Sequence, residues 1–168
     1  MATAENGGPE WSTMNMRRIV VGLLERSFIG LGRIARSSNE VELPEHLRTG
    51  FRGEEAALFE LLRKGYVVAA TRWRGSNMKG DVDLIAWEGP LLCFVEVKTR
   101  TAHDMAPAEV AVDAAKRRVL RRMARAYIRQ LPQTNPPQVR FDVMSVYLVP
   151  GKAQEIVHFE NAFGWGDS

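Results

Sequence analysis

The chain has little of what builds disulfide frameworks or cysteine zinc sites. Its 168 residues include one cysteine, Cys93, so no internal disulfide can form. The three histidines, His46, His103 and His158, are far apart in the sequence and lack the spacing of metal ligands. The fold must therefore rely on an ordinary hydrophobic core, for which the length is sufficient.

Long apolar runs are also missing. No run reaches the length that a helix needs to cross a membrane. The nearest candidate for an export signal is the apolar stretch 19–24 behind two arginines, and Glu25 and Arg26 end it too early. We therefore expect a cytoplasmic protein without a membrane span.

Neither sign of charge is in large excess. Lysine and arginine number 23 against 20 aspartate and glutamate residues, which gives a net charge of +3. Hydrophobic residues make up 45% and charged residues 26%, a composition typical of globular domains rather than fibrous or disordered chains. Overall charge alone therefore does not indicate a nucleic-acid partner.

Changes in composition divide the chain into three predicted parts: an N-terminal extension over 1–48, a main domain over 49–161 and a tail over 162–168. The extension is expected to hold a disordered start, an amphipathic helix and a linker, over 1–15, 16–36 and 37–48. We expect that helix to pack on the domain or on a partner copy, with a membrane-surface role as the weaker alternative.

Hydrophobic periodicity in the main domain predicts the order α-β-β-β-α-β-β. The helices are expected over 50–64, with Gly65 at the C-terminal cap, and from about 107 to 131. The strands are expected over 66–73, 81–87, 91–99, 139–149 and 153–161, with a tight turn at Gly89-Pro90. This order predicts a mixed β-sheet with helices packed on it, in an α/β or α+β domain.

The stretch 80–100 brings two carboxylates together. Side chains alternate along a strand, so Asp81 and Asp83 share one face, as do Glu96 and Lys98. In a regular hairpin closed around Gly89-Pro90, paired residue numbers sum to 179. That register places Asp83 opposite Glu96 and Asp81 opposite Lys98, with opposed Cβ atoms about 4.5–5.5 Å apart.

Two carboxylates at that distance repel each other unless a cation lies between them. One or two carboxylates, completed by water and a substrate phosphate, form the usual site of Mg²⁺. A lysine beside such a metal can position or deprotonate a water, while the metal stabilises charge on a phosphodiester. The alternative is an ordinary exposed face in which Asp83, Glu96 and Lys98 form a cross-strand ion pair.

Glu54 lies on the same helical stripe as Phe51, Leu58 and Leu61, so its side chain is expected to point toward the sheet. The candidate metal site would give this inward acid a partner. A first-turn acid that the helix dipole favours is the equally weighted alternative.

A concentrated basic segment follows. Residues 116–129 hold seven lysines or arginines, and no acid occurs from Ala114 to Arg140. Such a run is often only a solvated helix face, but in a nearly neutral protein it can also form a patch that follows phosphates. The nucleic-acid-binding candidates in and near this run are Arg74, Lys79, Arg100, Lys116, Arg117, Arg121 and Arg125.

Several blocks in order resemble the YraN family of bacterial proteins of unassigned function. They are GEEAALFELLRKGY (53–66), TRWRGSNMKGDVDLIA (71–86), FVEVKTR (94–100), PAEVAVDAAKRRVL (107–120) and VRFDVM (139–144). The resemblance covers about residues 49–149. That family is similar to restriction-endonuclease-like proteins with a PD-(D/E)XK site, and in particular to Holliday-junction resolvases.

The resemblance implies a role for each matching position. Asp83 and Glu96 match the metal ligands, with the carbonyl of Val97 as a further ligand. Lys98 matches the catalytic lysine, and Glu54 matches the acid of the first helix. Val82 replaces the proline that gives the motif its name, and Asp81 stands where the family more often has glutamate.

The leading hypothesis is a metal-dependent endonuclease acting on DNA, with branched or structured DNA as a candidate substrate and Mg²⁺ or Mn²⁺ as cofactor. The fold would be a restriction-endonuclease-like mixed sheet flanked by helices, behind an N-terminal helical extension. A homodimer is expected because resolvase-like nucleases often pair. Two alternatives are a non-catalytic nucleic-acid-binding module and an interaction protein whose charged face is structural.

Overall fold

The computed structural model describes residues 44–102, 112–131 and 136–166. The chain divides into a unit over Met1–Glu42 and a unit over Leu43–Ser168, and the second contains all of the described residues. The predicted amphipathic helix over 16–36 lies outside the described residues. Among the helices that are described, none is both long and apolar enough to span a bilayer.

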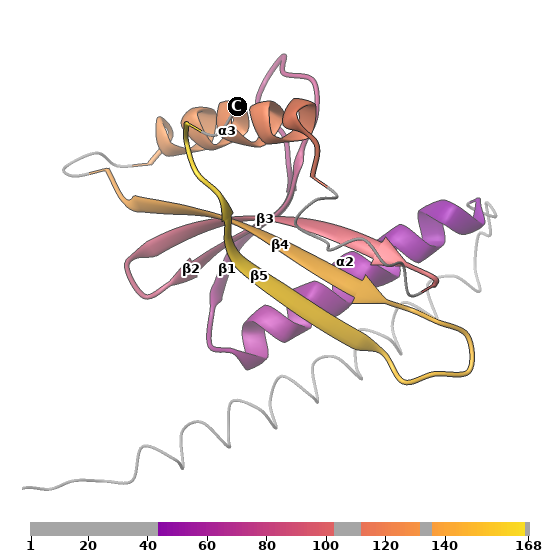
Figure 1. The fold of residues 1–168 in the computed structure, drawn as a ribbon. Coiled ribbons are helices and arrows are strands. Elements are labelled where there is room, and N and C mark those ends of the chain that lie inside the picture. Colours follow the sequence, from indigo (N-terminus) through magenta and orange to yellow (C-terminus); the bar gives the residue numbers. More distant parts are fainter. Residues whose placement is uncertain (1–43, 103–111, 132–135, 167–168) are drawn as a thin grey trace, which may run out of the picture. The chain divides into compact units, whose positions relative to one another are not determined.

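The described unit contains two helices and five strands (Figure 1). In chain order they are α2 (Glu45–Arg63), β1 (Val67–Trp73), β2 (Val82–Glu88), β3 (Leu91–Arg100), α3 (Ala114–Ile128), β4 (Gln138–Tyr147) and β5 (Glu155–Phe163). The predicted order of helices and strands is confirmed.

The strands form one mixed sheet in the order β1-β2-β3-β4-β5. Neighbouring strands are antiparallel except β3 and β4, which run parallel because the chain crosses between them through α3. Parallel neighbours need such a crossover, since a short turn can join only antiparallel strands. The predicted α/β fold class with a mixed sheet is therefore confirmed.

Each face of the sheet is covered by one helix (Figure 1). Ala57 and Leu61 of α2 pack with Val95 of β3, in one apolar layer. Leu120 and Met123 of α3 pack on the opposite face, in a second layer. Because β3 is buried on both faces, the sequence of its first half is apolar without alternation.

Two turns follow their predicted chemistry. Gly65 has a φ of +91° directly after α2, and its N–H donates to Leu62 O while the N–H of Tyr66 donates to Leu61 O. These bonds form a Schellman cap, which favours glycine at this position. Gly89 has a φ of +56° in the β2–β3 turn, a conformation that a two-residue hairpin favours.

Several predicted boundaries are wrong. Helix α2 begins at Glu45 rather than 50, because Pro44 precedes it as the N-cap and the predicted linker ends earlier. Helix α3 begins at Ala114 because the Asp113 side chain caps it; 107–111 lies outside the described residues. Strand β5 extends to Phe163, whose ring is buried, so part of the predicted tail belongs to the core.

Gly53 sets how closely α2 approaches β3. A Cβ atom at Gly53 would lie 2.9 Å from Thr99 Cβ and would also clash with Thr99 Oγ1. The Thr99 Cβ atom cannot rotate away, so a side chain at 53 would push the helix from the sheet. This close contact holds the next residue, Glu54, against the sheet.

We expect Gly53→Ala to lower the free energy of unfolding by about 1–3 kcal/mol, because overpacking outweighs the better helix propensity of alanine. Gly50→Ala is the matched control, since a Cβ there meets nothing within 4 Å. It should stabilise the protein by about 0.5–1 kcal/mol. Urea denaturation of the two variants measures both effects, and equal stabilisation by both would contradict the close contact.

Candidate metal centre

The site lies where β2 and β3 separate. Strand β2 stays paired with β1 as far as Val82, but its pairing with β3 ends at Leu84 opposite Val95. Strand β3 continues beside β4 to Arg100. In the gap, the side chain of Asp83 replaces the missing ladder bond: its Oδ2 accepts the N–H of Val97 at 2.7 Å.

The predicted hairpin register is confirmed from Glu88–Leu91 to Leu84–Val95, where the two residue numbers of every pair add up to 179. Its continuation is wrong, because Asp83 and Glu96 are not ladder partners, and neither are Asp81 and Lys98. The strands diverge once the Asp83 side chain takes the Val97 amide.

Glu96 is the most buried acid of the site, with 3% of its side chain exposed. Its Oε1 accepts a hydrogen bond from Lys98 Nζ at 2.9 Å. Its Oε2 lies 2.8 Å from Nζ of Lys116, which comes from α3. Each oxygen of this carboxylate therefore has an ammonium group beside it.

Glu54 reaches the same site from α2. Its carboxylate accepts two hydrogen bonds from the guanidinium of Arg72, from Nε at 2.5 Å and from NH2 at 2.9 Å. The guanidinium of Arg72 also lies 3.7 Å from the centre of the Phe51 ring. Arg72 has a φ of +49°, which is uncommon outside glycine and costs of order 1–3 kcal/mol. The paired hydrogen bonds to Glu54 help offset that cost.

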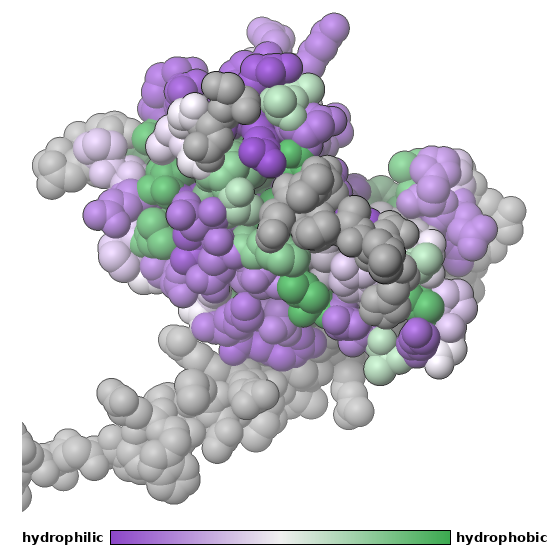
Figure 2. All heavy atoms as spheres, viewed as in Figure 1, coloured by the Kyte–Doolittle hydropathy of each residue, from purple (hydrophilic) through white to green (hydrophobic). Residues whose placement is uncertain are grey.

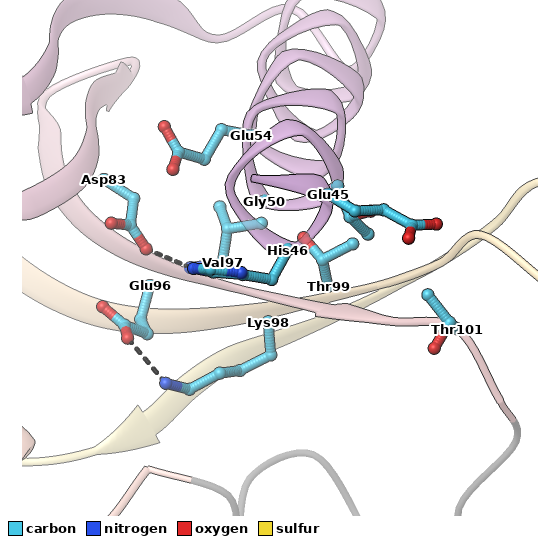
Figure 3. Close-up of a pocket in the computed structure, with 11 residues that line it drawn as sticks. Glu45, His46, Gly50, Glu54, Asp83, Glu96, Val97, Lys98, Thr99 and Thr101 are labelled. Carbon is cyan, nitrogen blue, oxygen red and sulfur yellow. Dashed lines mark hydrogen bonds and ion pairs between the residues drawn. The ribbon is translucent and has the colours of Figure 1, made fainter. Parts of the chain in front are cut away.

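Glu54, Asp83, Glu96 and Lys98 line a pocket of about 730 Å³ (Figure 3). In the close-up, Glu54 points from α2 toward Asp83, and Lys98 extends along β3 to Glu96. The pocket is lined by Glu45, His46, Thr49, Gly50, Glu54, Asp83, Glu96, Val97, Lys98, Thr99 and Thr101. All five residues predicted to hold a metal or act in catalysis, Glu54, Asp83, Glu96, Val97 and Lys98, therefore meet in one cavity.

The Asp83 carboxylate is held where ionisation is unfavourable. Burial and then repulsion from Glu96 raise the pKa of Asp83 to about 7, although the Val97 amide and Lys116 act in the opposite direction. The buried acid Asp142 differs, since hydrogen bonds from His158 and Arg140 outweigh burial and lower its pKa. Asp83 is thus a half-buried acid that lacks sufficient positive charge around it.

Asp81 forms the outer edge of this group. It accepts from Arg74 NH2 at 3.1 Å, and its other oxygen lies 3.8 Å from Lys116 Nζ. Burial lowers the pKa of Lys116, but attraction to Glu96, Asp83 and Asp81 outweighs burial and raises it overall. Lys116 therefore stays charged and links the outer acid to the inner one.

The residues of the pocket fit a hard divalent cation in their chemistry. Asp83 and Glu96 offer carboxylate oxygens, the donors that Mg²⁺ takes one or two at a time alongside water and phosphate. A cation would also relieve the repulsion that raises the Asp83 pKa. In the part of the chain that the structure describes, no three His, Cys, Asp or Glu side chains form a group that could hold a metal ion. Two carboxylates, rather than a complete protein cage, are the candidate ligands.

The predicted basic residues separate into different environments. Arg121 is 7% exposed and donates to Gly164 O at 2.8 Å, so it belongs to the interior rather than to a phosphate-binding surface. Lys116 pairs with Glu96 at 2.8 Å, and Arg117 donates to Val112 O at 2.8 Å. Of the predicted candidates, Arg74, Lys79 and Arg125 are exposed, and Arg100 is half-buried at the end of β3.

Three arginines that the sequence prediction did not select complete the exposed side of α3. Arg118, Arg122 and Arg129 are exposed together with Arg125, at successive spacings of four, three and four residues. The surface over α3 is largely hydrophilic (Figure 2). Helical periodicity could have found this stripe, because Leu120, Met123 and Ala124 mark the opposite, buried side.

The sequence also did not predict the ion pair of Arg72 with Glu54 or that of Lys116 with Glu96. In both pairs the acid is far away in the sequence from its basic partner. No local pattern predicts such contacts, because they depend on how the helices dock on the sheet.

Comparison with known proteins gives a consistent match over this region. The model of an uncharacterised protein family, UPF0102, matches residues 53–146. A UPF0102 protein of Koribacter versatilis is 49% identical over 124 residues, which cover 74% of this chain and 85% of that protein. A UPF0102 protein of Porphyromonas gingivalis is 40% identical over 122 residues, covering 72% of this chain and 87% of that protein. The family match includes Glu54, Asp83 and Glu96 of the pocket, whereas Glu45 precedes it.

We expect the metal-free protein to lose stability as the pH rises through about 7. The pKa of Asp83 is higher in the folded state than in the unfolded state, so its contribution is complete below the unfolded pKa of about 3.9 and is lost on ionisation. Asp83→Asn keeps an acceptor for the Val97 amide and should flatten this loss. Thermal melts in EDTA between pH 5 and 8 compare the two proteins, and parallel curves would contradict the expectation.

Proposed function

The chain belongs to the uncharacterised protein family UPF0102, the YraN family, and we propose that it is a metal-dependent nuclease that hydrolyses phosphodiester bonds in DNA. The observation that carries the proposal is the meeting of Asp83, Glu96 and Lys98 in one pocket at the fork between β2 and β3. The acids and the lysine come from two strands, and their side chains line one cavity at the fork.

Asp83 and Glu96 would hold Mg²⁺ or Mn²⁺, which supplies charge stabilisation at the phosphate when bound. The role of the Val97 carbonyl as a third ligand stays a prediction. The Val97 N–H has a separate structural role, because its hydrogen bond holds the Asp83 carboxylate at the fork. Glu54, held by Arg72, faces Asp83 from α2 and would orient water at the edge of the site.

Lys98 would act on the attacking water. Its ammonium lies 2.9 Å from Glu96, within the pocket, with 32% of its side chain exposed. In the proposed hydrolysis, the water oxygen forms a bond to phosphorus and passes its proton to bulk water, and the bond from phosphorus to the leaving sugar oxygen breaks. That oxygen takes up a proton, so no oxidant or further reactant is needed.

We expect purified protein with Mn²⁺ or Mg²⁺ to cleave at least one of branched, single-stranded and duplex DNA. Lys98→Ala and Asp83→Asn should lower the rate at least about a hundredfold, the scale of losing a positioned acid–base group. Lys152→Ala, an exposed change in the β4–β5 turn, should cleave at the wild-type rate. Gel assays on labelled DNA measure this, and no cleavage of any substrate by the wild type would refute the proposal.

The exposed stripe Arg118, Arg122, Arg125 and Arg129 is the proposed contact for the DNA backbone. Basic side chains on one helix face can follow phosphates, and each phosphate contact releases counterions. Association with DNA, pairing as a homodimer and a cytoplasmic location all remain predictions.

Arg118→Ala and Arg129→Ala should each weaken DNA binding for all sequences and lower the slope of log affinity against log salt by about 1. Fluorescence anisotropy over a salt series measures both quantities. Lys152→Ala is again the control, because it removes a charge from an exposed turn outside α3. An unchanged slope in both arginine variants would exclude this stripe as the contact.

A further inference from the structure

Four acids at and beside the fork between β2 and β3 each have a basic side chain near them before any metal binds. Glu54 pairs with Arg72, Asp81 with Arg74, and Glu96 with Lys98. The remaining acid, Asp83, has the ammonium of Lys116 nearby, and this attraction lowers the Asp83 pKa in part. These four acids and four bases together carry no net formal charge, so a divalent cation bound among them would leave two positive charges in excess. Glu45, which also lines the pocket, is not part of this group.

Lys116 is the group that competes most directly with such a cation. Its Nζ lies 2.8 Å from Glu96 Oε2 and 3.8 Å from Asp81 Oδ1. Lys98 holds the other oxygen of Glu96, so both oxygens of this carboxylate are already engaged by ammonium groups. A metal ion that uses Glu96 must share or displace one of them.

The position of Lys116 is fixed by the start of α3. Its own N–H donates to the side chain of Asp113, the N-cap, at 2.7 Å. Its side chain is 25% exposed, so the ammonium has a path from the carboxylates toward solvent. The loop before β2 is also attached to this helix, since Arg122 donates to Lys79 O at 2.6 Å. Because the start of α3 is held in place and the Lys116 side chain reaches solvent, its ammonium can leave Glu96 for another anion while the helix stays where it is.

We propose that Lys116 is a built-in counter-ion of the pocket: its ammonium occupies Glu96 in the free protein and transfers to a phosphate oxygen of the substrate when Glu96 binds a divalent cation. This inference rests on the proposed metal-dependent nuclease function. It follows that metal and phosphodiester strengthen each other's binding, because the phosphate compensates the added charge and accepts the released ammonium. Without DNA the site binds metal weakly.

The first test measures Mn²⁺ binding to the protein alone by isothermal titration calorimetry. Lys116→Met should bind Mn²⁺ at least about tenfold more tightly than the wild type, the size of effect that one neighbouring charge has on a proton equilibrium. Lys116→Arg keeps the charge and should bind as weakly as the wild type. Lys152→Met makes the same chemical change in an exposed turn and should leave the affinity unchanged.

The second test repeats the titration with a short single-stranded phosphorothioate oligothymidylate, which resists cleavage. The oligonucleotide should tighten Mn²⁺ binding to the wild type, and this gain should shrink in Lys116→Met. Thermal melts establish that each variant folds, and Lys116→Gln replaces Lys116→Met if the latter does not.

The outcomes separate the two proposals. If wild type and Lys116→Met both bind Mn²⁺ with equal affinity, the counter-ion role is wrong and the nuclease proposal stands. If Lys152→Met tightens Mn²⁺ binding as much as Lys116→Met does, the counter-ion role is also wrong, because the effect then comes from the overall charge of the protein. If neither wild type nor Lys116→Met binds Mn²⁺, with or without the oligonucleotide, both proposals fail.

Discussion

The hydrogen bond from the Val97 amide to the Asp83 side chain is the contact on which the rest of the site depends. A backbone N–H at the end of a ladder must find a partner, and here a carboxylate takes it in place of a strand carbonyl. Strand β2 can then leave β3 while it remains paired with β1. The fork that results leaves a pocket lined by Glu96 and Lys98, to which α2 contributes Glu54.

The acids Asp142 and Asp83 show that the same fold surrounds two carboxylates in different ways. Asp142 receives hydrogen bonds from Arg140, from His158 at 3.0 Å and from the Asn161 amide at 2.9 Å, and it contributes to a fully paired network. Asp83 has one backbone donor and a second acid, Glu96, near it. An arrangement that raises the pKa of a carboxyl in an open pocket is typical of functional sites rather than of structural ones.

Local patterns were sufficient for much of the fold. The apolar runs of β2 and β3, the turn at Gly89-Pro90 and the cap at Gly65 predicted the hairpin and its register as far as Leu84. Boundaries were less predictable: α2 begins five residues before the predicted start, and β5 reaches Phe163 because the ring packs in the core beside Phe141. Helical periodicity on α3 also separates buried Arg121 from exposed Arg118, although charge counting alone had grouped them.

The sequence by itself determined that Asp83, Glu96 and Lys98 lie on two consecutive strands joined by a short turn, because strand alternation and hairpin register are local properties. Only the tertiary structure decided what surrounds them. The ion pair of Arg72 with Glu54 joins β1 to α2 over 18 positions of the sequence. The ion pair of Lys116 with Glu96 joins α3 to β3 over 20 positions. Such pairs depend on how α2 and α3 dock, and docking is set by packing over the whole core rather than by neighbouring residues.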